Sequence, residues 1–339
     1  MPRRLVLHAG PHKTGTTALQ AAFAREAARL AEAGVLYPAT GRLGPAHHAL
    51  AEACRTGDRR LLEALSREAR GAETVLLSSE NFAPLDAPAL ARLRAALPVV
   101  EVTVVYTLRR LAALWPSHWR EMIKHGQSFG FADYMLPAIT GDVPPFIGPP
   151  LPARQVDTLA SVFGAEGLRL PVYDARRAGG RDQGPEFAEE ILFLTEPAAF
   201  ATVEMNVTPP DWESEAVRMG LGRVAHRLGY EERKGFRAAL LRELRSSPPG
   251  WLTRLREAVG RAPRLRLTER SPLVAAMQAE VVARHGAALL DPADDYFAPI
   301  SVAIPAFTPW MRTEADRVEA HRLVDRLAKP APQASTGSA

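Results

Sequence analysis

The chain has 339 residues, of which 47% are apolar and 24% charged, as in soluble globular proteins that bury a sizeable core. Its net charge of +4 is small and its arginines form no dense basic run, so nucleic acid is not expected as a partner. A single cysteine excludes an intrachain disulfide and a cysteine-based metal site. No apolar stretch approaches the length of a membrane span and no signal peptide is recognisable, so we expect a cytoplasmic protein.

The most informative stretch lies near the start of the chain. An apolar strand over 5–7 leads into a loop over 10–17, and an amphipathic helix follows. Glycines allow the tight turn that a phosphate-binding loop needs, and the helix N-terminus favours an anion. The predicted anion-binding residues are Pro11, His12, Lys13, Thr14, Gly15, Thr16 and Thr17.

Lysine is rare in this chain, which has only four lysines among 42 basic residues. Where any surface cation would serve, the sequence has arginine. Lys13 therefore indicates a compact charge that reaches a single oxygen atom, where a guanidinium would not fit. The alternative is a solvated loop cation.

The loop differs from the triphosphate-binding loop Gly-x-x-x-x-Gly-Lys-Ser/Thr, because Thr16 stands where that motif has lysine. Pro11 to Thr17 instead resembles the 5′-phosphosulfate loop of sulfotransferases, Pro-x-Lys-Thr/Ser-Gly-Thr-Thr. The resemblance implies 3′-phosphoadenosine-5′-phosphosulfate (PAPS) as co-substrate, and it implies a reaction that needs no metal. It also implies a P-loop-like α/β fold.

Two histidines stand at the predicted start of a helix over 49–53. His47 and His48 are adjacent, so they cannot face the same way on a helix, and at most one of them serves a given site. Two interpretations of this pair are possible. Either the histidines simply stand at a capped helix start with exposed imidazoles, or one of them serves the acceptor site.

The second strand, over 74–80, ends in Ser78, Ser79 and Glu80. Because parallel strands open on one crevice at their carboxyl ends, Glu80 is expected near the phosphate loop. It is the candidate general base, with His47 or His48 as the rival. Two other roles are open for Glu80, a cap for the next turn and a magnesium ligand in a nucleotide hydrolase.

A third strand, over 101–108, ends at Arg109, and Ser117 follows eight positions later. The same spacing occurs in a second sulfotransferase motif, in which the arginine and the serine bind the 3′-phosphate of the donor. Pro116 predicts that the next helix begins late, near Trp115 or Pro116, with Ser117 in its first turn.

Helix and strand alternate further along the chain, with a fourth strand over 168–173 that Pro171 places near an edge. A polar loop is predicted over 174–184, and the C-terminal half is predicted to be mainly helical. We expect one domain over 1–328 and a disordered tail over 329–339.

These observations predict a P-loop-like three-layer α/β fold with a central parallel sheet. The predicted function is transfer of a sulfuryl group from PAPS to a hydroxyl or amine of a carbohydrate, lipid or small-molecule acceptor, with Lys13, Glu80 and His48 as catalytic residues. The alternatives are a nucleotide kinase or hydrolase, and a nucleotide-binding protein without catalysis. The sequence does not choose an acceptor or an oligomeric state.

Overall fold

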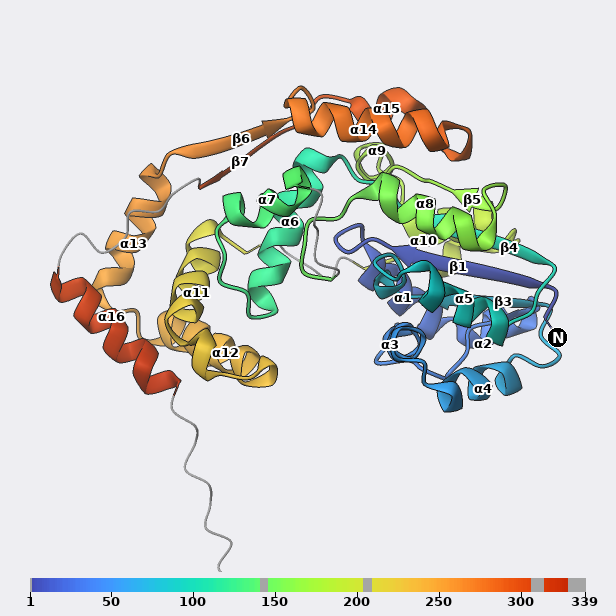
Figure 1. The fold of residues 1–339 in the computed structure, drawn as a ribbon, viewed down its shortest axis with the longest axis horizontal. Coiled ribbons are helices and arrows are strands. Elements are labelled where there is room, and N and C mark those ends of the chain that lie inside the picture. The colour runs from blue at the N-terminus through green and yellow to red at the C-terminus, as the bar shows by residue number, and fades with distance from the viewer. Residues whose placement is uncertain (1, 141–145, 204–208, 306–313, 329–339) are drawn as a thin grey trace, which may run out of the picture. The chain divides into compact units, whose positions relative to one another are not determined.

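The computed structural model describes residues 2–140, 146–203, 209–305 and 314–328, and its central feature is a parallel sheet of five strands (Figure 1). The strand order is β2-β3-β1-β4-β5, so the strand that leads into the predicted phosphate loop lies in the middle. The strands are β1 Arg4–Gly10, β2 Val35–Leu36, β3 Thr74–Ser78, β4 Glu101–Tyr106 and β5 Leu168–Arg169.

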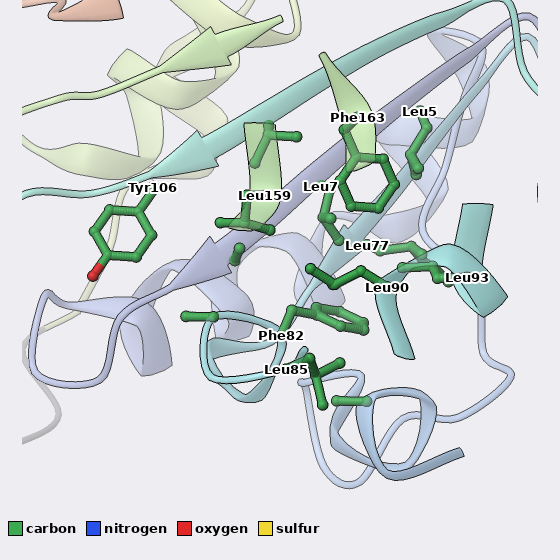
Figure 2. Packing of buried hydrophobic residues seen from close by; sticks show 14 of the residues in the cluster. Leu5, Leu7, Leu77, Phe82, Leu85, Leu90, Leu93, Tyr106, Leu159 and Phe163 are labelled. Carbon is green, nitrogen blue, oxygen red and sulfur yellow. The ribbon is translucent and has the colours of Figure 1, made fainter. Parts of the chain in front are cut away.

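Helices cover both faces of this sheet because its strands are apolar on both faces. Leu5 and Leu7 of β1 point into one core, which Figure 2 shows, and Val6 points into the other. The helices around the sheet are α1 Thr16–Arg25, α2 Ala27–Glu32, α3 His48–Thr56, α4 Arg59–Glu68, α5 Ala87–Ala96, α8 Pro152–Phe163, α9 Tyr173–Ala178, α10 Gln183–Glu186, α14 Pro272–His285 and α15 Ala293–Phe297. The predicted three-layer α/β fold is confirmed.

The chain divides into two compact units. The first unit is Met1–Trp115, Val143–Val207 and Leu267–Ser301, and it holds the five-stranded sheet. The second unit is Pro116–Asp142, Thr208–Arg266 and Val302–Ala339. The single domain over 1–328 stays a prediction, and the tail 329–339 lies outside the described residues.

The second unit is mainly helical, as predicted for the C-terminal half. Its helices are α7 Phe131–Thr140, α11 Asp211–Val224, α12 Tyr230–Ser246, α13 Gly250–Arg261 and α16 Glu314–Leu327. Three elements cross the sequence boundary between the units: α6 Leu111–Lys124, β6 Arg264–Thr268 and β7 Ser301–Pro305, of which β6 and β7 pair in a two-stranded sheet. None of the helices in the described part of the chain combines the length and the apolar character needed to cross a bilayer.

The edges of the main sheet are its shortest strands. β5 lies at one edge, as Pro171 predicted, although only two residues pair regularly. β2 lies at the other edge and was not predicted, because two residues are too few for an alternating pattern to be recognised.

The prediction of a late start for α6 was wrong, since this helix begins at Leu111 and contains Pro116 in its interior. The Leu111 N–H donates to the side-chain oxygen of Gln278 at 2.9 Å, a partner 167 residues away. The first turn is also apolar and buried. This distant cap and the burial of the first turn outweigh the local effect of proline, and Ser117 is the seventh residue of α6, not in its first turn.

The prediction of a loop over 174–184 was also wrong, because the helices α9 and α10 occupy much of this segment. Arg176 of α9 is buried and its Nε donates to the carboxylate of Asp291 at 2.8 Å. This ion pair joins residues 115 positions apart, so local sequence gave no sign of it.

Candidate functional site

The loop between β1 and α1 has the backbone of an anion-binding turn. Lys13 and Gly15 both adopt left-handed backbone angles, with φ of 72° and 79°, on either side of Thr14. Such alternation of handedness lets successive N–H groups converge on one anion. Gly15 is the N-cap of α1 and provides no side-chain cap for the first-turn N–H groups. The N-terminus of α1 is therefore suited to hold a phosphate.

Threonine side chains stabilise this loop from within. The Thr14 hydroxyl donates to the Pro11 carbonyl at 2.7 Å, and both Thr14 and Thr16 are buried. Thr17 is half-buried at the start of α1. The hydroxyl of Thr14 thus fixes the shape of the turn, while His12 and Lys13 are half-buried side chains of the same loop.

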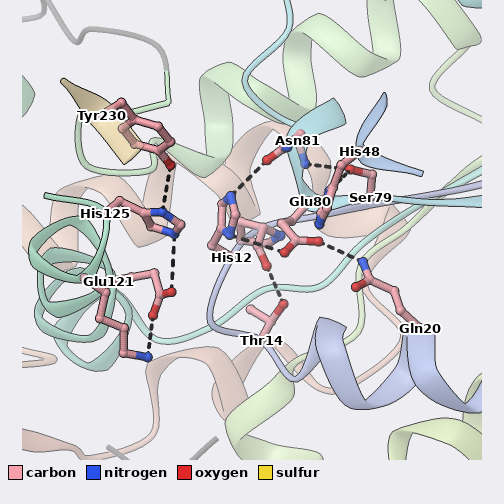
Figure 3. A network of polar contacts seen from close by, with 12 residues as sticks. His12, Thr14, Gln20, His48, Ser79, Glu80, Asn81, Glu121, His125 and Tyr230 are labelled. Atoms are coloured by element: carbon pink, nitrogen blue, oxygen red, sulfur yellow. Dashed lines mark hydrogen bonds and ion pairs between the residues drawn. The ribbon is translucent and has the colours of Figure 1, made fainter. Parts of the chain in front are cut away.

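Glu80 follows β3 directly, at the start of the short 3₁₀ helix η1 (Glu80–Phe82), and contacts this loop. A Cβ atom on Gly10 would lie 2.8 Å from the Glu80 Cα, so only glycine allows the two backbones to approach this closely. Glu80 is 7% exposed, and its carboxylate contacts His12 and Gln20 in Figure 3. Its Oε2 accepts a hydrogen bond from Gln20 Nε2 at 2.8 Å, and its Oε1 lies 3.4 Å from His12 Nδ1.

The environment keeps Glu80 ionised. Burial alone would raise the pKa of its carboxyl, but the nearby His12 and His48 and the hydrogen bond from Gln20 outweigh burial. The pKa of Glu80 is consequently lower than usual, and the group is a carboxylate at neutral pH. A carboxylate beside an anion-binding loop is able to accept a proton.

The two adjacent histidines differ in their surroundings. His48 has its Nδ1 2.8 Å from the Ser79 hydroxyl and belongs to the network around Glu80 (Figure 3). His47 is fully buried, with Nδ1 accepting from the Ser78 N–H at 3.1 Å and Nε2 donating to the Pro38 carbonyl at 3.0 Å. Both ring nitrogens of His47 thus bind the backbone, and of the pair only His48 is available to a site.

Buried histidines predict that the protein loses stability in mild acid. Burial lowers the pKa of both His8 and His47 from 6.5 to about 4. Below pH 6.5 the unfolded chain takes up protons that the folded chain does not, so unfolding becomes easier as the pH falls towards 4. Each histidine should remove about 2–3 kcal/mol of unfolding free energy between pH 7 and 4.5. Urea unfolding at the two pH values measures this loss.

The variant His47→Gln separates this effect from the titration of carboxyl groups. It is expected to unfold at lower urea concentration at pH 7, because it disturbs two buried hydrogen bonds, and to show a smaller pH dependence than the unmodified chain. An unmodified chain that is equally stable at pH 7 and 4.5 would contradict the burial of neutral imidazoles.

Arg109, just beyond β4, contacts the same loop. Its Nη1 donates to the Lys13 carbonyl oxygen at 2.5 Å, and its guanidinium lies over the ring of Tyr173, 5.3 Å from the centroid. Its Nε is buried without a hydrogen-bond partner, 3.5 Å from the carboxylate of Asp174. A buried N–H donor that lacks a partner is suited to donate a hydrogen bond to a ligand oxygen.

Ser117, the other residue predicted to bind the 3′-phosphate, belongs to the second unit. It is 9% exposed within α6, two residues past the boundary between the units. The first unit therefore brings together the loop 11–17, Glu80, His48 and Arg109, and Ser117 is not among them.

Sequence reasoning missed two polar side chains of this network, Gln20 and Asn81. Gln20 is buried on α1 between the apolar residues Leu19 and Phe23, and a polar residue on an apolar helix face is a signal that was available. Asn81 has its Oδ1 3.2 Å from His12 Nε2, but nothing in the sequence marks an asparagine next to Glu80 for this contact.

The close contact between Gly10 and Glu80 leads to a second prediction. Gly10→Ala should destabilise the protein by about 1–3 kcal/mol, because the residue has a φ of 102° and its new Cβ would collide with the Glu80 backbone. Thermal unfolding measures the loss. Gly71→Ala is the matched control, since Gly71 has a φ of 86° but open space around it. Equal losses in the two variants would mean that the contact with Glu80 does not matter.

No family model matches the chain, and no curated protein matches it in sequence. One similar solved structure is the crystal structure of a sulfotransferase from Alicyclobacillus acidocaldarius, with 15% identity and a TM-score of 0.38. The match covers 68% of this chain and 98% of that one. Within the described residues, no group of three or more His, Cys, Asp or Glu side chains is arranged to hold a metal ion.

Proposed function

We propose that this chain is a sulfotransferase that uses PAPS as the donor. One observation carries the proposal: Arg109 Nη1 binds the carbonyl of Lys13, so the anion-binding loop and the arginine beyond β4 adjoin each other in one unit. PAPS has phosphate groups at both its 5′ and 3′ positions, and this arrangement offers positive charge for both. A nucleotide without the 3′-phosphate would leave the Arg109 side of the site without an anion.

The roles of the residues follow from the charge of the donor. When bound, PAPS supplies a sulfuryl group activated by its bond to the 5′-phosphate. The N–H groups at the start of α1 and the hydroxyls of Thr16 and Thr17 would hold that phosphate. Lys13 would neutralise the charge that develops on the leaving oxygen. Arg109 would bind the 3′-phosphate, and Ser117 is proposed to assist it on the basis of the eight-residue spacing alone.

Glu80 is the proposed general base. As the acceptor oxygen forms its bond to sulfur, its proton passes to the Glu80 carboxylate. The bond from sulfur to the 5′-phosphate oxygen breaks with its electron pair, and adenosine 3′,5′-bisphosphate leaves. Little covalent chemistry is asked of the protein, so alignment and charge neutralisation provide most of the rate. His48 is the second candidate base, at the other end of the same network.

The test is a transfer assay with PAPS and panels of carbohydrate, phenol and amine acceptors. The proposal predicts release of adenosine 3′,5′-bisphosphate together with a sulfated product. Magnesium-dependent hydrolysis of ATP, with no turnover of PAPS, would favour a nucleotide hydrolase instead. Donor binding without transfer to any acceptor would favour a binding protein. The acceptor class and the cytoplasmic location stay predictions.

A further inference from the structure

The carboxylate of Glu80 is held by two side chains, one on each oxygen. Gln20 of α1 donates to Oε2 at 2.8 Å, and His12 of the loop lies 3.4 Å from Oε1 (Figure 3). Gln20 is 2% exposed, so its amide is enclosed by protein. Glu80 is therefore attached to the loop that would hold the donor and to the helix that follows this loop.

We propose that Gln20 is a positioning residue, whose amide fixes the Glu80 carboxylate so that the oxygen beside His12 faces the acceptor hydroxyl. This inference rests on the proposed function. A glutamate side chain has several rotatable bonds, and general-base catalysis needs its oxygen within hydrogen-bond distance of the proton that it takes. A hydrogen bond to one oxygen of a buried carboxylate restricts the direction of the other.

The chemistry of the amide suits this role better than a charged group would. An arginine or lysine at position 20 would form a charge-assisted bond to Glu80 and weaken it strongly as a base. The Gln20 amide is neutral, so it orients the carboxylate and leaves most of its negative charge available. His12 makes the second contact from a position directly before Lys13, which ties the orientation of the base to the shape of the donor loop.

Several titratable groups face Glu80, and each affects its pKa. His12 from the loop and His48 from α3 lower it, as does the hydrogen bond from Gln20. The charge of Glu80 in turn acts on buried His8 of β1 and on Tyr37, which follows β2. Removing the Gln20 amide leaves the other groups in place, so the pKa of Glu80 should rise.

The experiment replaces Gln20 by methionine, which has a similar shape and no N–H donor. The pKa of Glu80 is measured by NMR titration of the full chain carrying ¹³C-labelled glutamate, with Glu80→Gln to assign the signal. We expect the pKa to rise and kcat to fall about 10- to 100-fold, while affinity for adenosine 3′,5′-bisphosphate is unchanged. The acid limb of the kcat profile should move to higher pH.

Gln155→Met is the matched control, because the Gln155 side chain bonds Tyr106 and accepts a hydrogen bond of 2.6 Å from its hydroxyl. It should leave the Glu80 pKa and the pH profile unchanged. If Gln20→Met fails to fold, Gln20→Leu removes the same N–H donor with a shorter apolar side chain, and the Glu80 pKa should again rise.

An unchanged Glu80 pKa in the Gln20 variants would overturn the inference. So would a loss of kcat that comes without movement of the acid limb, since this indicates a structural role only. The titration needs no substrate, so it tests the contact even if no acceptor is found. Failure of the proposed function would instead appear as an unmodified chain that does not turn over PAPS.

Discussion

Lys13→Ala is expected to lower kcat by about 10²- to 10³-fold while weakening donor binding much less. The physical reason is that, in the proposed reaction, negative charge grows on the 5′-phosphate oxygen as its bond to sulfur breaks. An ammonium beside that oxygen therefore stabilises the transition state more than the ground state. Lys13 lies between His12, which contacts Glu80, and Thr14, which is buried in the turn. Steady-state kinetics with PAPS, together with titration of the product nucleotide, separates the two effects.

Two further variants control for this result. Lys13→Arg keeps the charge but replaces the compact ammonium by a broad guanidinium, so it should restore only part of kcat. Lys234→Ala removes a solvent-exposed lysine that pairs with Glu231 on α12, and kcat should not change. If Lys13→Ala retains full turnover, Lys13 does not stabilise the leaving group.

Glu80→Gln is expected to lower kcat by about 10²- to 10⁴-fold with little change in donor affinity. Glutamine keeps the size of the side chain but does not accept the acceptor proton. Because the pKa of Glu80 is depressed, turnover by the folded chain should persist until the pH falls below the usual carboxyl range. A pH profile of kcat/KM measures this loss of activity on the acid side. The buried histidines destabilise the fold over the same pH range, so the folded fraction is measured at each pH to separate the two effects.

The comparison with His48→Gln identifies the base. His48 contacts Ser79 and influences Glu80 through its charge, so its loss should reduce kcat by a smaller factor than the loss of Glu80. The opposite order, with His48→Gln the more damaging change, would assign the proton transfer to the histidine.

The sheet could be predicted because its strands carry continuous apolar runs. β1, β3 and β4 are buried on both faces, and this pattern is legible without tertiary information. The start of α6 and the helix α9 could not be predicted, because their stabilising partners, Gln278 and Asp291, lie more than a hundred residues away.

The candidate site was predictable to a similar degree and for related reasons. Parallel strands bring their carboxyl ends together, so the positions of Glu80 and Arg109 beside the loop follow from the topology alone. The topology does not indicate which of His47 and His48 is available to the site. That depends on which imidazole is occupied by the Pro38 carbonyl, and the structure shows that it is His47. The contact of Gln20 with Glu80 depends on the rotation of α1 about its own axis. The spacing of apolar residues along the helix indicates this rotation only roughly, so the contact could not be predicted.

The most direct test of donor recognition is calorimetric titration of the chain with adenosine 3′,5′-bisphosphate and with 5′-AMP. The 3′-phosphate should strengthen binding markedly in the unmodified chain. Arg109→Ala should abolish this difference, and it should weaken binding of the bisphosphate far more than binding of 5′-AMP, which loses only the support that Arg109 gives to the Lys13 carbonyl. Equal affinity of the unmodified chain for the two nucleotides would contradict the assignment of Arg109 and, with it, PAPS as the donor.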